Sequence, residues 1–364
     1  MSSFFDKFIL NNGVEIPNRL VIAPITLFSS NPDGTLNNAE REYLKLRATN
    51  IGLYILGATS VSQEGISFEN QPRAISDKDL PSLTERANII KNQGAKAILQ
   101  LHHGGEDSDI EYSGIEPVVI DKLTNKQINR IIEDFGKATE LAIKSGHDGI
   151  EVHGASGYLC QQFYSRHFNH RKDEWGGSDE KRMNFALKVI DICCKIKDKY
   201  NKPDFIIGYR ITPEEYYKDG LTMTECIKLV KEIIKKPIQY LHIYQSNYFR
   251  KAYNGETAGQ IRLKTIHELT KNKVALIGCG GLKSGDDFKS ALNSGYSEFI
   301  AAGMASMMNR NLGILLKEGK VNELEVEIDP NHPERYAMPP TLWKMCFQGI
   351  GWFPPLKKIH INKK

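Results

Sequence analysis

Short apolar runs alternate with longer amphipathic segments along the whole chain. Eight of the runs are apolar at both odd and even positions. This pattern is typical of parallel strands that helices cover on one face and a packed interior covers on the other. We predict one β-strand in each run, at 18–25, 52–61, 96–103, 149–154, 205–211, 238–245, 274–281 and 298–304.

The segments between these runs carry apolar residues at the i, i+3, i+4 spacing of amphipathic helices. The clearest helical segments are 38–49, 82–93, 125–146, 179–200 and 222–236. Two pairs have the spacing of a capping box, which marks the start of a helix: Ser82 with Glu85 and Thr124 with Gln127. Glycines stand where helix C-caps are expected, at Gly94, Gly146 and Gly295.

Eight repeats of strand and helix favour a (β/α)8 barrel, or TIM barrel, which takes about 250 residues and tolerates long βα loops. We assign residues 1–326 to the barrel and 327–364 to a C-terminal tail, with long βα loops at 62–81, 103–123 and 155–178. A doubly wound sheet is the rival fold, but it usually opens with a glycine-rich phosphate turn after its first strand. Here the first strand ends in Ala-Pro-Ile-Thr, so we prefer the barrel.

The composition of the chain limits the kinds of partner and site that we expect. The chain has 364 residues, a net charge of +4 and no long basic block, so we expect no nucleic-acid partner. No apolar run reaches the ~20 residues of a membrane span, so we expect no membrane association. Six cysteines without any C-x-x-C spacing disfavour a disulfide scaffold, a zinc site and an iron–sulfur cluster, and they fit a reducing cytoplasm.

The C-terminal stretch 338–355 is rich in proline and large apolar side chains. Exposed to water, it would form an apolar patch of the kind that marks an interaction surface. We therefore expect the tail to pack on its own barrel or on a partner subunit, and we expect a homodimer.

In barrels of this kind the active site lies at the carboxyl ends of the strands. The residues at those ends are Thr26, Ala58, Gln100, His103, His153, Ser156, Tyr158, Arg210, Gly280, Gly281 and Gly303. The set holds hydrogen-bond donors, one fixed cation and several glycines, but no pair of carboxylates for glycoside hydrolysis. Its histidines have no carboxylate or cysteine beside them at ligand spacing, so we expect no metal.

The glycines after the last two strands indicate a phosphate group. Barrels commonly bind phosphate through backbone amides after the seventh and eighth strands, here Gly280, Gly281 and Gly303. A tight turn without any ligand is the alternative for the Gly-Gly pair. With Gln100 and Arg210 on other strands, the phosphate site suggests a cofactor whose ring has a polar edge.

Several motifs carry a resemblance to a known family. NRLVIAPIT begins at Asn18, LQLHHGG at Leu99, and GHDGIEVHGASGYLCQQF at Gly146 with NHRKDEWGGSDEKR after it. GYRITP follows from Gly208, and IGCGGL and IAAGM lie near the end of the barrel. Through these stretches, from about residue 5 to 315, the chain resembles the old yellow enzyme family of FMN-dependent oxidoreductases.

The resemblance implies an enzyme in which NADH or NADPH reduces FMN, and the flavin passes hydride to a small-molecule acceptor such as an activated alkene. It implies an FMN site made of Pro24, Ile25, Thr26, Ala58, Gln100, Arg210, Gly280, Gly281, Gly303 and Met304. Ala58, Gln100 and Arg210 would contact the isoalloxazine ring, Thr26 would lie near its N5/O4 edge, and Gly281 and Gly303 would hold the phosphate.

The same resemblance gives the catalytic residues. His153 would bind the carbonyl oxygen of the acceptor, and Tyr158 would be the proton donor. The family normally has a second histidine or an asparagine three residues after the first, and this chain has Ser156 there. A further departure is Met304 where an arginine often pairs with the phosphate, which makes Lys283 a candidate for the missing cation.

Two alternatives remain open at the level of sequence. One is a reductase of flavins, quinones or nitro compounds with little alkene activity. The other is a phosphate-ligand-binding barrel without catalysis, which Tyr158 and Arg210 count against. Three further tyrosines are candidates for shaping the substrate pocket: Tyr164, Tyr244 and Tyr248.

Overall fold

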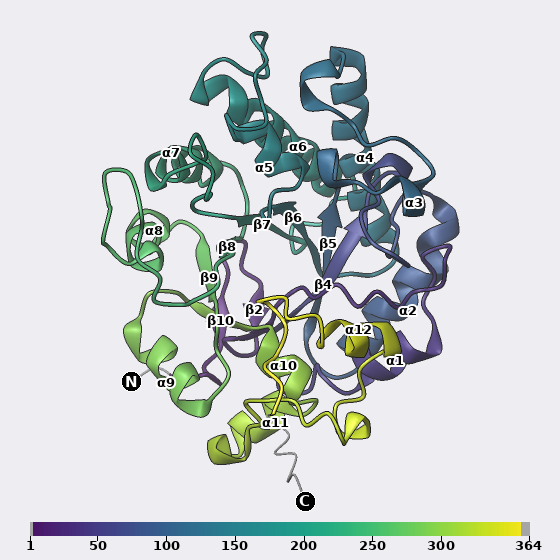
Figure 1. The fold of residues 1–364 in the computed structure, drawn as a ribbon, viewed down its shortest axis with the longest axis vertical. Coiled ribbons are helices and arrows are strands. Elements are labelled where there is room, and N and C mark those ends of the chain that lie inside the picture. Colours follow the sequence, from purple (N-terminus) through teal and green to yellow (C-terminus); the bar gives the residue numbers. More distant parts are fainter. Residues whose placement is uncertain (1–2, 358–364) are drawn as a thin grey trace, which may run out of the picture.

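Eight parallel strands close into a barrel in the computed structural model, which describes residues 3–357 (Figure 1). Around the barrel the strands follow the order β10-β3-β4-β5-β6-β7-β8-β9. They are β3 (Leu20–Ile22), β4 (Leu53–Ser60), β5 (Lys96–His102), β6 (Gly149–Gly154), β7 (Ile206–Ile211), β8 (Tyr240–Ile243), β9 (Ala275–Cys279) and β10 (Phe299–Ala302). Each predicted strand is present, and the (β/α)8 fold is confirmed.

Helices form the outer layer around the strands (Figure 1). They are α1 (Asn38–Lys45), α2 (Leu80–Lys91), α3 (Ile110–Ser113), α4 (Asn125–Lys144), α5 (Leu159–Tyr164), α6 (Asp179–Lys199), α7 (Met223–Ile233), α8 (Arg262–Thr270), α9 (Gly285–Ser294), α10 (Met304–Met308), α11 (Leu312–Lys317) and α12 (Pro340–Met345). Short 3-10 turns are η1 (Gln63–Gly65), η2 (Asp77–Asp79), η3 (Gly105–Asp107), η4 (Ile120–Lys122), η5 (Val321–Glu323) and η6 (Pro333–Arg335). None of the helices in the described range is long and apolar enough to cross a membrane.

One of the two predicted capping boxes is wrong. The box of Thr124 with Gln127 is present at the start of α4. The pair at Ser82 is not a cap, because α2 begins at Leu80, with a proline in its first turn, where that residue fits best. The capping box of this region belongs to Ser76, one turn earlier. The hydroxyl of Ser82 instead accepts a hydrogen bond from the backbone amide of Leu36, at 2.5 Å.

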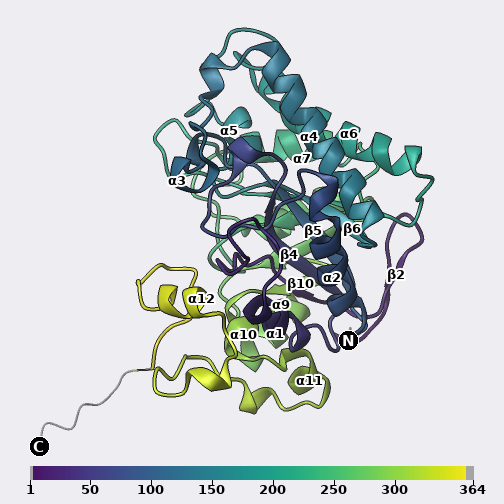
Figure 2. The same ribbon diagram turned by 90° about the vertical axis from the view of Figure 1, so that its right-hand side faces the viewer.

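Side chains alternate between two apolar cores along each strand, as the geometry of a strand requires. On β4, Leu53 and Ile55 point into the barrel, whereas Tyr54 and Leu56 pack against the helices outside. The hairpin of β1 (Phe8–Ile9) and β2 (Glu15–Ile16) adds the fully buried Ile16 to the interior core. In Figure 2 this hairpin and α12 lie on opposite sides of the strands. The hairpin therefore covers one end of the barrel, and a site can form at the end nearer to α12.

The described part of the tail folds back onto its own barrel. Tyr336, Leu342 and Phe353 are buried in the outer core. The guanidinium of Arg47, in the loop after α1, donates to the carbonyl oxygens of Tyr336 and Ser306 and so joins the tail to the barrel. In Figure 1 the yellow tail runs beside α10 and α11 and across the lower half of the barrel. The end of the predicted tail, 358–364, lies outside the described residues.

Candidate active site

A cavity of about 670 Å³ lies at the carboxyl ends of the barrel strands. Its size falls within the range of about 300–1,000 Å³ that ligand pockets occupy. Each residue of the predicted FMN and catalytic sets lines it: Pro24, Ile25, Thr26, Ala58, Gln100, His153, Ser156, Tyr158, Arg210, Gly280, Gly281, Gly303 and Met304. Strands far apart in sequence therefore bring the candidate residues into one site.

The register of the parallel strands places the polar wall of the cavity. His153 of β6 lies beside Arg210 of β7, and Gln100 of β5 lies beside Glu151 of β6. Because side chains alternate along a strand, Glu151 and His153 face the same side, one layer apart. The three cavity-lining side chains of Gln100, His153 and Arg210 are almost fully buried, so their positions are set by strand geometry.

Tyr158 reaches the cavity through a sharp turn after β6. Ser156 and Gly157 have φ angles of 61° and 83°, in the left-handed region. The turn begins at Gly154, where a Cβ atom would stand only 2.2 Å from the hydroxyl oxygen of Tyr209, so only glycine fits. The turn is held by the Ser156 amide, which donates to the hydroxyl of Thr212 at 2.9 Å.

Burial fixes the protonation of the two central side chains. Desolvation, followed by the charge of Asp107, raises the pKa of the Tyr158 phenol far above its usual value, so the phenol keeps its proton at neutral pH. Desolvation lowers the pKa of His153 well below its usual value, so this imidazole is neutral. The two rings lie 5.2 Å apart between centroids. The wall thus offers a phenol O–H and a neutral imidazole side by side.

His102 belongs to the same aromatic cluster, although the sequence pattern gives it no functional claim. Its ring lies 4.5 Å from that of Tyr158 and 5.3 Å from that of His153. Burial lowers its pKa to about 3, and its Nε2 atom lies 3.1 Å from the hydroxyl of Ser67. Strand parity was the available signal, since His102 stands two residues after Gln100 and faces the same side.

At the opposite side of the cavity, glycines expose the backbone. Gly280 and Gly281 have positive φ angles of 127° and 67°, and a Cβ on Gly280 would collide with the backbone of Asn247 at 2.7 Å. Gly303 precedes α10, whose first amides have no acceptor within the helix. Lys283, the candidate cation, is not among the lining residues, whereas Met304 is.

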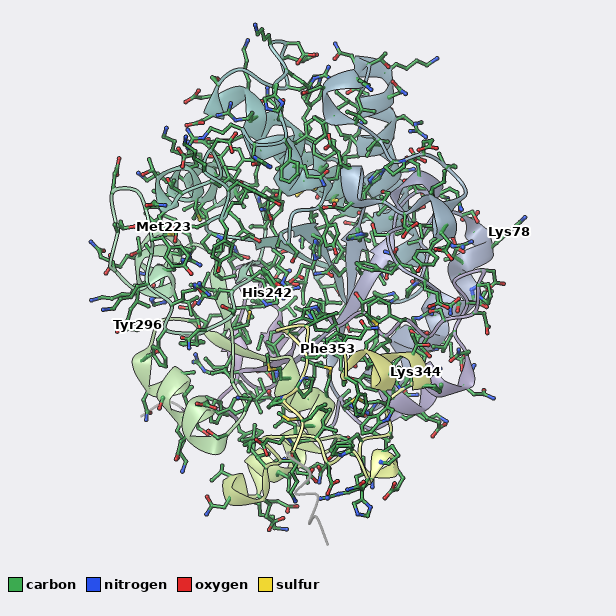
Figure 3. The ribbon with its side chains drawn as sticks, viewed as in Figure 1. Lys78, Met223, His242, Tyr296, Lys344 and Phe353 are labelled. Carbon is green, nitrogen blue, oxygen red and sulfur yellow. The ribbon has the colours of Figure 1, made fainter. Side chains whose placement is uncertain are left out.

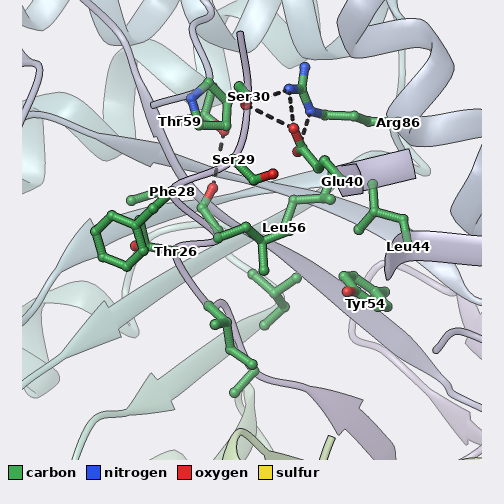
Figure 4. Close-up of a pocket in the computed structure, with 17 residues that line it drawn as sticks. Thr26, Phe28, Ser29, Ser30, Glu40, Leu44, Tyr54, Leu56, Thr59 and Arg86 are labelled. Atoms are coloured by element: carbon green, nitrogen blue, oxygen red, sulfur yellow. Dashed lines mark hydrogen bonds and ion pairs between the residues drawn. The ribbon is translucent and has the colours of Figure 1, made fainter. Parts of the chain in front are cut away.

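The loop after β3 carries Thr26 and Phe28, which both line the cavity. Figure 4 is a close-up of a second, smaller pocket beside this loop, which Thr26, Phe28, Glu40 and Arg86 also line. Phe28 has a φ angle of 52°, an uncommon conformation for a bulky residue, which the surrounding structure must hold in place. Behind it, the guanidinium of Arg86 binds the carboxylate of Glu40 and the hydroxyl of Ser30, all buried. This buried ion pair anchors the loop from the side away from the cavity.

Further lining residues were not found from the sequence pattern. Phe68 and Gln245 come from βα loops, and Met345, Ile350 and Trp352 come from the tail. Of the three tyrosines considered for the pocket, Tyr244 lines it and lies 5.1 Å under the guanidinium of Arg210. The prediction is wrong for the other two tyrosines, which do not line the cavity. Tyr164 donates a hydrogen bond to the Glu225 carbonyl oxygen, and the Tyr248 hydroxyl forms one with Ser297.

The donor set fits FMN. Three buried polar atoms of the lining residues have no partner among residues 3–357: Arg210 Nε, His153 Nδ1 and Gln245 Oε1. Buried polar atoms are normally hydrogen-bonded, so unpaired ones in a cavity indicate a polar ligand. An isoalloxazine ring offers carbonyl oxygens and an N–H on one edge, and the glycine-rich end gives space and amides for a phosphate.

Known proteins match both the sequence and the fold. Residues 3–323 match the family model described as NADH:flavin oxidoreductase / NADH oxidase. A probable NADH-dependent flavin oxidoreductase, YqiG, of Bacillus subtilis is 37% identical over 96% of this chain and 97% of its own length. An NADH:fumarate oxidoreductase of Klebsiella pneumoniae is 33% identical over 93% of this chain, but only 38% of that longer protein is covered.

Among solved structures, an old yellow enzyme homologue of Zymomonas mobilis superposes with a TM-score of 0.78 at 23% identity, covering 93% of this chain and 99% of that one. At this identity the superposition speaks for the fold alone. The family model and the relative that matches over nearly its full length also identify the family. The chain belongs to the NADH:flavin oxidoreductase / NADH oxidase family, the old yellow enzyme family, and is an FMN-containing oxidoreductase that uses NADH or NADPH.

Proposed function

We propose that this enzyme reduces the double bond of an activated alkene and that Tyr158 is the proton donor. One observation carries the proposal: the protonated phenol of Tyr158 and the neutral imidazole of His153 line the same wall of the cavity. The relative named for fumarate reduction supports it, because fumarate is an alkene activated by its carboxyl groups.

In this proposal, FMN bound in the cavity would supply the hydride transfer from NADH or NADPH to the β-carbon of the acceptor. His153 donates a ring N–H to the carbonyl oxygen of the acceptor and draws electron density away from the double bond. Ser156, which also lines the cavity, would donate a second hydrogen bond from its hydroxyl. Tyr158 donates its proton to the α-carbon, and because that carbon becomes strongly basic, a phenol of raised pKa is acidic enough.

The same proposal assigns the residues that hold FMN. Gln100 and Arg210 would bind the polar edge of the ring, Ala58 would lie against its face, and Thr26 would lie near its reactive edge. The backbone at Gly280 and Gly281 and the amides from Gly303 to Met304 hold the phosphate. The presence of Gly280, Gly281 and Gly303 in the lining of the cavity supports this, since residues without a side chain leave their backbone amides open to a ligand.

Reduction of quinones or nitro compounds is the second candidate function. Ser156 favours it, because a serine hydroxyl reaches less far than the histidine or asparagine that family members carry at this position. Its backbone also lies in the left-handed region, and its amide is tied to Thr212, so the residue does not move easily toward an acceptor. A weaker grip on a carbonyl oxygen slows alkene reduction more than it slows electron transfer to a quinone.

Anaerobic half-reactions test the proposal. Purified protein reconstituted with FMN is reduced with NADH and, separately, with NADPH, and flavin bleaching is recorded. The reduced enzyme is then mixed with an enone, fumarate, a quinone or a nitroarene. We expect bleaching by a nicotinamide and fastest reoxidation by an activated alkene. Protein that binds no FMN, or reduced enzyme that only the quinone and nitroarene reoxidise, contradicts alkene reduction as the function.

We also propose the organisation that the sequence suggests: a barrel of residues 1–326 with a capping tail of 327–364, a homodimer, and a cytoplasmic location. The contacts of Tyr336 and Leu342 with the barrel support a tail that packs in cis. The dimer is tested by the mass in solution. A monomeric mass contradicts it without affecting the assignment of the reaction.

A further inference from the structure

A charged pair lies buried beneath the cavity and has no role in the reaction described above. Glu151 of β6 and His242 of β8 are both 0% exposed, and 2.9 Å separates the carboxylate Oε2 from the ring Nδ1. Figure 3 places His242 near the centre of the barrel. Burying a charge costs free energy unless the charge is paired and hydrogen-bonded, so this pair limits which positions the neighbouring polar side chains can take.

Each member of the pair stands beside a residue proposed to contact FMN. Glu151 is the register partner of Gln100 on β5, and His242 is the register partner of Arg210 on β7. The Gln100 amide nitrogen donates to Glu151 Oε1 at 2.7 Å. Glu151 and His242 do not line the cavity, whereas Gln100 and Arg210 do. The pair therefore acts on a ligand through these two neighbours and through Cys279 of β9, a cavity-lining residue that contacts His242.

The carboxylate determines which way the Gln100 amide points. A carboxylate accepts hydrogen bonds and donates none, so the NH₂ group of Gln100 must face Glu151. The carbonyl oxygen of Gln100 is then turned away from Glu151 and left for the cavity. The polar edge of an isoalloxazine ring carries an N–H between two carbonyl groups, and it needs one acceptor opposite that N–H. Gln100 held in this orientation would supply it, and Arg210 would supply donors for a neighbouring carbonyl.

The groups around the pair favour both of its charges. Burial opposes a charge on Glu151, but His242 and Arg210 lower its pKa below the usual value. Burial likewise opposes a charge on His242, but Glu151 raises its pKa above the usual value, against the charge of Arg210. Cys279 of β9 also faces His242, and the imidazole lowers the pKa of that thiol. Tyr240, earlier on β8, completes the set and stays neutral because burial raises its pKa.

We propose that the buried Glu151–His242 pair orients Gln100 and sets the charge behind Arg210, and that it thereby tunes the reduction potential of bound FMN. With His242 protonated, Glu151, His242 and Arg210 together carry one net positive charge. With His242 neutral, they carry none. Reduction adds negative charge to the flavin ring, so the protonated pair favours the reduced state. Both are positioning residues, since neither touches the ring, and the inference rests on the proposed contacts of Gln100 and Arg210.

The first test uses the wild-type holoenzyme and measures the FMN midpoint potential against pH by spectroelectrochemistry. If reduction raises the proton affinity of His242, the flavin couple takes up one additional proton across a pH window above about 6.5, the usual histidine pKa that Glu151 raises here. The potential then falls more steeply there, by a further tenfold in equilibrium per pH unit, or about 30 mV for a two-electron couple. Free FMN measured in parallel gives the slope without protein.

The second test compares two substitutions with opposite expectations. His242→Asn keeps a donor toward Glu151 but removes the titrating cation, so the preference for reduced FMN should fall about tenfold, as expected for one charge acting across a layer of side chains. The additional pH slope should vanish as well. Glu151→Gln removes the anion and, with it, the reason for His242 to hold a proton, so the net charge and the potential stay nearly constant. Its FMN affinity should fall about tenfold because Gln100 is free to turn.

A second histidine–glutamate pair, which is only partly buried, provides the control. His267 Nε2 and Glu298 Oε1 are 2.7 Å apart, and Glu298 stands just before β10, at the end of the barrel away from the cavity. His267→Asn and Glu298→Gln should change stability but leave the FMN potential and its pH slope unchanged.

The inference is wrong if His242→Asn binds FMN with the wild-type potential and slope. If the His242 variant does not fold, a wild-type slope equal to that of free FMN is enough to reject it. Failure of the wild-type protein to bind FMN is a separate outcome that overturns the proposed function first.

Discussion

The two sides of the cavity are built in different ways. The wall formed by β5, β6 and β7 carries Gln100, His153 and Arg210, each nearly buried and placed by strand register. The cap is apolar and comes from a loop and from the tail, with Phe68 and the half-exposed Trp352 among its members. The difference teaches that the chemistry depends on rigid strands, whereas the shape of the acceptor is decided by segments that can change without disturbing the barrel.

Apart from the loss of the proton donor Tyr158, the largest effect should come from the wall, at His153. His153→Ala removes the donor for the acceptor oxygen, and loss of one such donor typically costs about 10²–10³ in rate. We expect kcat/KM for an enone or fumarate to fall by that factor. The matched control is His170→Ala, because His170 is an exposed histidine that pairs with Asp121 away from the cavity. A loss below threefold at His153 means that the wall does not bind the acceptor there.

A smaller effect, a gain in affinity for phenolic ligands, should come from Ser156, which lies where the wall meets the turn after β6. Asparagine tolerates the left-handed backbone that Ser156 adopts, at φ 61°, and its amide reaches further than a hydroxyl. Ser156→Asn should bind phenolic ligands about tenfold more tightly, as expected for one added hydrogen bond. Ser156→Ala serves as the control and should bind them no more tightly than the wild type. Equal affinity of the asparagine variant indicates that this side chain does not face the acceptor.

Acid should destabilise the fold through its buried histidines, inside and outside the site alike. Burial lowers the pKa of His102 and His147 to about 3, so the native state leaves them neutral while the unfolded chain protonates them below about pH 6.5. Unfolded protein then binds more protons, and stability falls as pH drops from about 6.5 toward 3, by at most about 1.4 kcal/mol per pH unit for each histidine.

His147 isolates this effect, because it lies outside the cavity and its Nδ1 bonds to Ser145 Oγ at 2.8 Å. His147→Asn keeps a polar group at that position and does not titrate. Urea denaturation at pH 7 and pH 5 should show a smaller acid loss than in the wild type. An unchanged difference between the two pH values rules out His147 as a source of the acid sensitivity.

The smallest effect should come from the cap. Trp352→Ala widens the cavity without removing a polar group, so we expect a several-fold shift of kcat/KM in favour of bulkier acceptors and little change in flavin reduction. Trp343→Ala is the control, since Trp343 stacks on Tyr336 within the tail at 5.7 Å and does not line the cavity. The same shift in both variants would indicate a general loosening of the tail.

The comparison also explains what sequence alone predicts. The wall was predictable because parallel strands align their carboxyl ends, so Gln100, His153 and Arg210 converge whatever the loops do. The cap was not, because the position of Trp352 depends on how the tail crosses the mouth, which no periodic pattern encodes. His102 shares strand parity with Gln100, and this parity was the one sequence feature that could have placed it beside Tyr158. The prediction of a capping box at Ser82 was wrong because a proline in the first turn allows α2 to begin earlier, at Leu80.

The most direct test of the proposed chemistry is the Tyr158→Phe variant measured in each half-reaction by anaerobic stopped flow. The phenylalanine keeps the ring that packs against His102 and His153, but it has no proton to give. We expect FMN reduction by NADH or NADPH to proceed at nearly the wild-type rate. Reoxidation by an activated alkene should slow by about 10²–10⁴, the usual contribution of a general acid. Equal losses in both half-reactions, or none in reoxidation, would contradict Tyr158 as the proton donor.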